Sequence, residues 1–418
     1  MYNFEQLGEK YRQELIDLTC DLVKIPTENI PPNGDEKEGQ EFFKKYLSEK
    51  LGMEIDAFSP ADLPDYQTNP EFLHRNHEGR QDVIGIWKGS GGGRSLTLTG
   101  HMDVVPKEPM PWVVCEPYHP IIKDGRIYGR GSCDMKGGLA ANTIAVKMLK
   151  DAGFQPKGDI MIESVVDEEY AGANGTIAAR LKGYNADFSI ISEAVNLNVC
   201  PACVGGFLVK ITIQGTAGMP FTGEEIVNPA YDLADLIHII RAFGEKRDRE
   251  CVKPALWDKS AQDSQIVITK VKAGEVQESG QLSTPINAWV EIVIQTYPGE
   301  KQEDLEVSFR DFVRSKFRDP DLLTIETEYH YCRPTSMDPN HEGVQLLAEC
   351  TKEFTDQGIV NGSLLSCDMF AFHEIGKVPC VLFGPIGGNF HAPDEWVDID
   401  SLMTVAKSIA KFIVQWCG

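Results

Sequence analysis

His101 and Asp103 are the first residues of this chain whose types and spacing could carry chemistry. They lie in the stretch 96–106, where apolar residues alternate as in a strand with one buried face. Side chains two residues apart on an extended chain point to the same side, so the two emerge together. The pair suits a metal ligand and an aspartate that orients its imidazole. A surface turn is the alternative.

Asp134 is a second candidate, in the glycine-rich turn 128–138 directly before a helix predicted over 139–149. An aspartate at this position could simply cap the N-terminus of the helix. It could also be a ligand that two cations share. The surrounding glycines favour the shared ligand, because a metal ion must approach the backbone closely.

More carboxylates follow two further predicted strands. The strand at 160–166 runs into Asp167-Glu168-Glu169, and the strand at 188–192 ends in Glu193. Three adjacent carboxylates repel one another, which a solvated loop tolerates. Near other ligands, a cation would offset this repulsion.

Strands and helices alternate in this part of the chain, as in an α/β fold. In open α/β sheets, sites form beyond the carboxyl ends of the strands. We therefore expect convergence there of His101, Asp134, Glu169 and Glu193. His391 likewise follows a predicted apolar strand, at 378–383.

The remaining patterns of this region predict further elements. Helices are predicted at 5–24, 36–51, 342–354 and 399–416, and a strand at 83–87. The polar segment 59–81, which contains three prolines, is expected to be a surface loop. The glycines between 89 and 93 fit no phosphate-binding pattern, so we interpret them as a hairpin turn before the strand at 96.

The pattern changes at residue 206. Strands are predicted at 207–214, 265–271, 289–295 and 323–331, with helices at 229–243 and 303–317. Strands mixed with two helices indicate an α+β insert with an antiparallel sheet. The domains are therefore expected to be 1–205 with 334–418, and 206–333.

Composition narrows the classes of partner. The chain has 418 residues, of which 42% are hydrophobic, and a formal net charge of −23. That charge argues against nucleic acid and anionic membranes as partners. No signal-peptide pattern and no apolar run long enough to span a membrane are visible, so a cytoplasmic location is expected. Eleven scattered cysteines suit reduced thiols. The lone pair Cys200 and Cys203 could be redox-active, could bind metal, or could be ordinary thiols near a strand.

The whole set of motifs resembles a family of zinc amidohydrolases and peptidases. This family includes acetylornithine deacetylase, succinyl-diaminopimelate desuccinylase, aminoacylase and glutamate carboxypeptidase. The resemblance covers nearly the whole chain. It rests on Gly-His-Met-Asp at 100–103, Gly-Arg-Gly-Ser-Cys-Asp-Met-Lys-Gly-Gly at 129–138, Asp-Glu-Glu at 167–169, Ser-Glu at 192–193 and His-Ala-Pro-Asp-Glu at 391–395.

The resemblance implies a site for two divalent metal ions, zinc or alternatively cobalt or manganese, roughly 3.5–4 Å apart. The implied ligands are His101 and Glu193 on one ion, His391 and Glu169 on the other, and Asp134 on both. Asp103 would support this site, and a water shared by the metals would be the nucleophile. Glu168 would be the general base, and the peptide bond between Asp134 and Met135 would be cis.

The family fold is a catalytic domain with a mostly parallel sheet flanked by helices, and an inserted lid through which two copies form a homodimer. In the lid this sequence departs from the family pattern. Met219 stands where the family has a histidine that stabilises the oxyanion, and losing such a donor costs about 100–1,000-fold in rate. Gln295 stands in place of an arginine for a substrate carboxylate, and Leu282 in place of an asparagine.

Other groups could replace these lid residues. Arg333, His330 and Asn287 are candidates, as are His238 and His373, although a histidine within a helical pattern is usually structural. The predicted substrate-binding residues are Met219, Gln295, Arg333 and Gly384.

The leading hypothesis is a metal-dependent hydrolase that cleaves the amide bond of a small N-acyl amino acid or related N-acyl compound. A di-zinc dipeptidase or carboxypeptidase is the alternative. The changed lid also suggests a metal-binding protein without activity. Against that rival, a decayed enzyme has little reason to keep Glu168, which ligates nothing.

Overall fold

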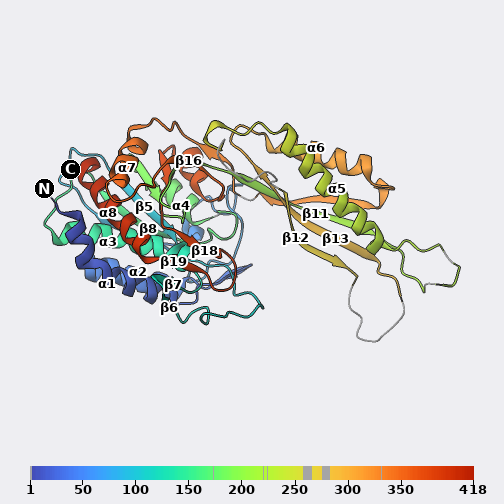
Figure 1. Cartoon of the computed structure of the whole chain (residues 1–418), viewed down its shortest axis with the longest axis horizontal. Coiled ribbons are helices and arrows are strands. Elements are labelled where there is room, and N and C mark those ends of the chain that lie inside the picture. Colours follow the sequence, from blue (N-terminus) through green and yellow to red (C-terminus); the bar gives the residue numbers. More distant parts are fainter. Residues whose placement is uncertain are drawn as a thin grey trace. The chain divides into compact units, whose positions relative to one another are not determined.

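The computed structural model describes residues 2–172, 174–219, 221–223, 225–257, 266–274, 283–330 and 332–418 (Figure 1). The chain divides into two compact units. Unit 1 comprises Met1–Cys203 and Thr335–Gly418, and unit 2 comprises Val204–Pro334. The sequence places these boundaries at 205/206 and 333/334.

Unit 1 is built on a mixed sheet, which in the described residues has nine strands in the order β15-β10-β17-β9-β5-β8-β4-β3, with β16 beside β10. The middle strands β17, β9, β5 and β8 are parallel, while β10 pairs antiparallel with β17 and β4 antiparallel with β8. The α/β class is confirmed, and the mostly parallel sheet is corrected to a mixed one. The strands are β3 (Glu54–Phe58), β4 (Asp82–Trp87), β5 (Leu96–His101), β8 (Ile160–Val165), β9 (Phe188–Ile191), β10 (Val199–Cys203), β15 (Thr335–Ser336), β16 (Val360–Ser363) and β17 (Cys380–Leu382).

Helices cover both faces of this sheet (Figure 1). Leu98, Ile162 and Ile190 point from neighbouring strands into one large apolar core. That core is shared by α1 (Phe4–Val23), α3 (Gly137–Asp151), α7 (Glu342–Lys352) and α8 (Ile399–Trp416). On the opposite face, Glu163 pairs with Arg180 of α4 (Gly175–Lys182). The helix α2 (Lys37–Leu51) packs beside β4.

The predicted hairpin after β4 is wrong, because β8 lies between β4 and β5. The glycines instead serve a close backbone contact. A Cβ on Gly89 would lie 2.3 Å from the carbonyl oxygen of Lys157. The glycine-rich composition therefore predicted that β4 pairs with β5, whereas both strands pair with β8, which comes later in the chain.

Two small antiparallel sheets complete the described part of unit 1. One has the order β18-β19-β7-β6, with β18 (Gly387–Gly388), β19 (Trp396–Asp398), β7 (Arg126–Tyr128) and β6 (Ile121–Lys123). The other pairs β1 (Asn29–Ile30) with β2 (Asn33–Gly34). The first places the segment around His391 beside the segment that leads to Asp134.

Unit 2 has an antiparallel sheet in the order β12-β13-β11-β14, as the insert was expected to have. The strands are β11 (Gly205–Gln214), β12 (Ile266–Ala273), β13 (Asn287–Thr296) and β14 (Leu323–His330). Their apolar face packs against α5 (Pro229–Glu250) and α6 (Gln302–Lys316). Helix α5 extends beyond the predicted end at 243, because Arg247 is buried in a two-pronged ion pair with Glu300 at 2.8 and 2.7 Å.

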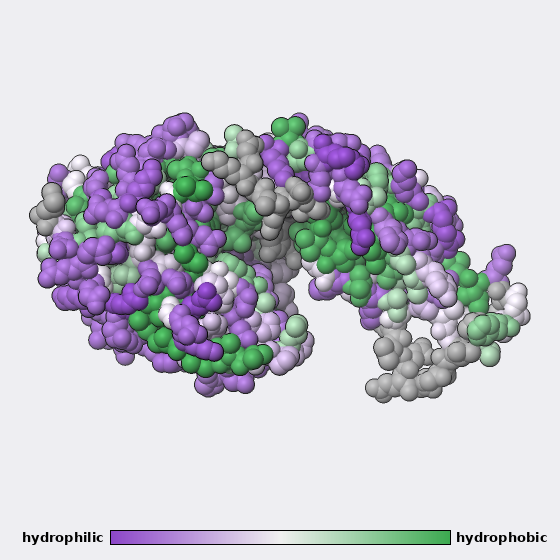
Figure 2. All heavy atoms as spheres, in the orientation of Figure 1, coloured by the Kyte–Doolittle hydropathy of each residue, from purple (hydrophilic) through white to green (hydrophobic). Residues whose placement is uncertain are grey.

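The surface agrees with the composition of the chain. Hydrophilic side chains cover most of the face shown in Figure 2, consistent with the net charge of −23. Within the described ranges, no helix has the length and apolar character needed to cross a membrane.

Candidate metal centre

Three neighbouring parallel strands deliver the predicted side chains to one edge of the sheet. His101 is the last residue of β5, Glu168 and Glu169 follow β8, and Glu193 follows β9. In register, His101 lies beside Val165, the last residue of β8. The carboxyl ends of these strands therefore meet, as the sequence predicts.

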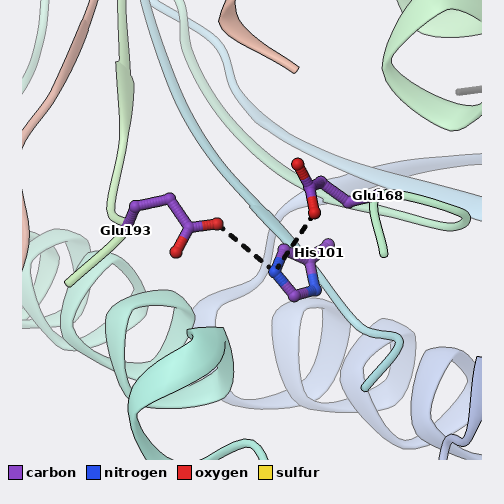
Figure 3. Close-up of side chains that lie close together, drawn as sticks. All are labelled: His101, Glu168 and Glu193. Atoms are coloured by element: carbon purple, nitrogen blue, oxygen red, sulfur yellow. Dashed lines mark ion pairs between the residues drawn. The ribbon is translucent and has the colours of Figure 1, made fainter. Parts of the chain in front are cut away.

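His101 lies at the centre of the first group of side chains (Figure 3). Its Nε2 is 3.1 Å from Asp134 Oδ1, 3.3 Å from Glu193 Oε1 and 3.9 Å from Glu168 Oε2. Its Nδ1 is 2.8 Å from the backbone oxygen of Asp103, whereas the Asp103 carboxylate is 3.7 Å away. The imidazole is thus oriented by the backbone of Asp103 rather than by its side chain.

His391 forms the other side of the site. Its Nε2 is 3.1 Å from Asp134 Oδ2 and 3.1 Å from Glu169 Oε2. Asp134 therefore lies between the two histidines, with one carboxylate oxygen toward each. The peptide bond between Asp134 and Met135 is cis, as the resemblance implies. The structure brings together all five predicted ligands, namely His101, Asp134, Glu169, Glu193 and His391.

The Asp103 carboxylate holds the acidic turn after β8. Asn29 Nδ2 donates to it at 2.7 Å, and the backbone N–H groups of Glu169 and Glu168 donate at 3.0 and 3.3 Å. Asp103 is fully buried. Its carboxylate thus fixes the backbone from which Glu168 and Glu169 project.

Asp167 points away from this site into an ion network of its own. Arg75 Nη1 donates to it at 2.5 Å, and Arg80 bonds both Asp167 and Glu36. The side chains of Arg75 and Arg80 are each 2% exposed. The repulsion within the acidic run is therefore relieved by arginines at its first carboxylate. The loop 59–81 has exposed residues in its second half, such as Asn76 and Glu78, as the sequence predicts, but the side chains of Arg75 and Arg80 are buried.

We expect the Arg80→Met variant to lower the free energy of unfolding by about 3–5 kcal/mol, because it leaves the buried carboxylate of Glu36 uncompensated and removes one of the two arginines that bond Asp167. Urea denaturation followed by tryptophan fluorescence measures this. The control is Arg12→Met, which removes the exposed ion pair with Asp400 and is expected to cost about 0–1 kcal/mol. Equal losses in both variants would contradict the role of Arg80.

Burial raises the pKa values of Glu193 and Glu168, two carboxylates beside His101. Burial, followed by the charge of Asp134, raises the pKa of Glu193 to about 7. Burial also raises the pKa of Glu168 well above its usual range. At Asp134 burial acts in the same direction, but hydrogen bonds with His101 and His391 lower its pKa overall. Crowded carboxylates facing imidazole nitrogens are a donor set that fits zinc and similar divalent ions.

The distances agree with that chemistry. Within the described part of the chain, two groups have ligand atoms that all lie within 4.8 Å of one another. One contains His101, Glu168 and Glu193, and the other contains His101, Asp134 and Glu169. The residues present therefore fit a metal site.

Gly384 packs against the backbone of Glu193, one of the predicted metal ligands. A Cβ on Gly384 would lie 2.1 Å from the carbonyl oxygen of Glu193, and a Cβ on Gly138 would lie 2.0 Å from that of Ser192. Both glycines thus allow the segment that ends in Glu193 to pack closely. A contact between Gly384 and substrate stays a prediction.

The other residues predicted to bind substrate belong to unit 2, and part of the predicted lid lies outside the described part of the chain. Met219, Gln295 and Arg333 belong to unit 2, and their roles stay predictions. Leu282 and the side chain of His330 lie outside the described residues.

The other two histidines named as possible replacements, His373 and His238, have different surroundings. His373 has both ring nitrogens engaged, at 2.8 Å from Thr335 Oγ1 and 3.2 Å from the backbone nitrogen of Cys380, which indicates a structural role. His238 is exposed on α5.

The pair Cys200 and Cys203 lies on β10, and both thiols are buried. Burial raises the pKa of the Cys200 thiol. A buried thiol with a raised pKa is a poor nucleophile, so the structure favours ordinary thiols.

Comparison with known proteins gives consistent matches along the chain. Residues 97–415 match the model described as Peptidase family M20/M25/M40. N-formyl-4-amino-5-aminomethyl-2-methylpyrimidine deformylase of Bacillus subtilis is 26% identical over 457 residues, covering 100% of this chain and 98% of that protein. Succinyl-diaminopimelate desuccinylase of Nautilia profundicola is 28% identical over 394 residues, covering 90% of this chain and 99% of that protein.

A solved structure has the same fold. It is described as a dinuclear metal-binding peptidase of the M20 family from Bacillus subtilis. It matches with a TM-score of 0.61 and 16% sequence identity, covering 98% of this chain and 99% of that chain.

Proposed function

This chain belongs to the peptidase family M20/M25/M40, and we propose that within it the chain is a metal-dependent deacylase of small N-acyl compounds. Membership makes it an enzyme of the amidohydrolase and peptidase type. One observation carries the proposal: the Asp134 carboxylate lies between His101 and His391, with 3.1 Å from one oxygen to each imidazole.

Five residues would hold the metal ions. We assign His101 and Glu193 to one ion, His391 and Glu169 to the other, and Asp134 to both. Nitrogen and carboxylate donors suit zinc, with cobalt or manganese as alternatives. Bound divalent ions supply Lewis-acid charge, which polarises an acyl carbonyl and lowers the pKa of water.

Glu168 is assigned as the general base. Its side chain is 10% exposed, and its Oε2 lies 3.9 Å from His101 Nε2, farther than the oxygens of Asp134 and Glu193. A carboxylate beside the ligands can accept a proton from the attacking water and return it to the leaving nitrogen. Asp103 supports this step by fixing the backbone N–H of Glu168.

The substrate is proposed to lack the carboxylate of an ordinary N-acyl amino acid. The resemblance places Gln295 at the position of the family's arginine for that carboxylate. The Bacillus subtilis relative is named for an N-formyl aminopyrimidine, which bears no carboxylate. The desuccinylase relative is named for a substrate that bears several. We therefore favour an N-formyl or similar small acyl group on a neutral or aromatic amine.

A substrate panel tests this proposal with zinc-loaded protein. The panel compares an N-formyl aminomethylpyrimidine, N-acetyl amino acids, N-succinyl-diaminopimelate and dipeptides, with release of the amine as the readout. We expect the highest kcat/KM for the neutral formyl compound. A preference for the succinyl or dipeptide substrates would overturn the substrate class. Failure to hydrolyse any of them would overturn the proposed deacylase. Pairing through unit 2 and a cytoplasmic location stay predictions.

A further inference from the structure

We propose that Glu395 is a positioning residue that ties the loop carrying His391 to the turn carrying Asp134, so that both are set by one buried carboxylate. The inference rests on the proposed metal site. Glu395 lies four positions after His391 and is not one of the proposed metal ligands. Glu395 closes the motif at 391–395, and the sequence alone predicts no role for it.

The Glu395 carboxylate accepts hydrogen bonds from the turn before α3. Its Oε1 accepts hydrogen bonds from the backbone N–H groups of Cys133 at 2.9 Å and Asp134 at 3.1 Å. Its Oε2 accepts from the N–H of Gly131 at 2.9 Å and from Arg130 Nη1 at 2.8 Å. Glu395 is completely buried. The carboxylate therefore fixes the backbone of Asp134 directly.

The same residue anchors the loop that carries His391. The backbone oxygen of Glu395 accepts from the N–H of Gly129 at 2.9 Å, and the next residue, Trp396, pairs with Tyr128 between β19 and β7. Within the loop, Asn389 Nδ2 donates to the backbone oxygen of Asp394 at 3.0 Å. Glu395 thus lies where the closed loop meets the Asp134 turn.

This anchor matters because packing alone holds His391 weakly. The His391 side chain is 45% exposed, whereas that of His101 is fully buried. His391 also adopts a positive φ of 55°, a conformation that a non-glycine residue keeps only when its surroundings impose it. The position of its imidazole relative to Asp134 therefore depends on how the loop is attached.

Glutamine at position 395 cannot replace the carboxylate. Each carboxylate oxygen faces two donors, and the four partners are three backbone N–H groups and a guanidinium. The amide NH2 of glutamine would face donors in either orientation. Glu395→Gln therefore breaks hydrogen bonds at the turn without changing the size of the side chain.

The chain offers a matched control in Glu163. Glu163 and Arg180 form another buried ion pair, with both side chains 0% exposed, against 1% for Arg130 and Glu395. Glu163 lies within β8 and bonds none of the turn residues. Glu163→Gln thus removes a buried charge of the same kind while leaving the Asp134 turn intact.

The experiment measures cobalt binding to the full chain by visible absorption and by competition with a chelator. We expect Glu395→Gln to weaken cobalt binding by about 10–100-fold and to change the absorption of the bound cobalt, as loss of a residue that orients ligands does. Glu163→Gln is expected to lower Tm but to keep the wild-type affinity and spectrum. Circular dichroism verifies folding. If Glu395→Gln does not fold, Glu395→Asp is measured instead, and the same loss of cobalt affinity, about 10–100-fold, is expected.

Two results would overturn the inference. One is wild-type cobalt affinity and spectrum in the folded Glu395 variant, and the other is an equal loss in Glu163→Gln. The proposed function fails differently: a wild-type protein that binds cobalt and hydrolyses nothing would overturn the deacylase while the role of Glu395 stands. A wild-type protein that binds no cobalt would overturn the metal site itself.

Discussion

Replacing Glu168 by glutamine is expected to reduce kcat for amide hydrolysis by about 10²–10⁴-fold while metal binding stays intact. The amide keeps the shape of the side chain but cannot accept the proton of the attacking water. Its neighbours remain in place, because Asp103 holds the turn through the backbone N–H groups of residues 168 and 169. Steady-state kinetics together with metal analysis of the same preparation measures both quantities.

The metal content decides how a loss of activity is interpreted. If Glu168→Gln loses metal together with activity, Glu168 acts as a ligand and its assignment as the base is wrong. If the variant keeps more than about a tenth of wild-type kcat, another group accepts the proton, because general bases contribute at least about 10²-fold.

Replacing Asp134 by alanine is expected to have the largest effect on metal binding. Its two oxygens face different histidines, each at 3.1 Å, so the substitution removes a donor from both sides of the site. It also leaves His101, Glu169, Glu193 and His391 without the residue that joins them. We expect affinity for both ions to fall by more than about 100-fold, beyond what loss of a supporting residue causes, and hydrolysis to become undetectable.

Asp394, three residues after His391, provides the control for this prediction. Its carboxylate accepts hydrogen bonds from the backbone N–H groups of Val113 and Val114, at 3.0 and 2.8 Å through Oδ1. Asp394→Asn is therefore expected to keep the wild-type number of bound ions. Asp134→Ala protein that still binds two ions tightly would contradict the shared position of Asp134.

Residues that sit directly after strands were predictable from sequence. His101 and Glu193 carry local signals, because an apolar strand precedes each and parallel strands bring their ends together. The position of Asp134 followed from a glycine-rich turn before a helix. The pairing of β19 with β7 brings Asp134 and His391 together, and no local sequence pattern predicts this pairing. The sequence pattern predicted Asp134 and His391 near the carboxyl ends of strands, and the resemblance implied that the two share a metal ion.

Long-range contacts account for what the sequence did not predict. Arg75 and Arg80 lie in a polar segment without periodicity, so their buried bonds with Asp167 left no pattern to find. The prediction of a hairpin after β4 was wrong because strand order depends on which strand edges bury apolar area. The glycine content of a loop carries no information about that order. Helix α5 was predicted too short because an ion pair between Arg247 and Glu300 supports its polar end.

The central claim is that this site uses divalent metal ions to hydrolyse an amide. The most direct test is to remove metal from the protein with a chelator and titrate zinc back while following hydrolysis of the best substrate of the panel. The account predicts negligible activity without metal and a rise that reaches its plateau at about two zinc ions per chain, as in a two-metal site. Full activity in the chelated protein, or a plateau that Asp134→Ala reaches equally well, would contradict it.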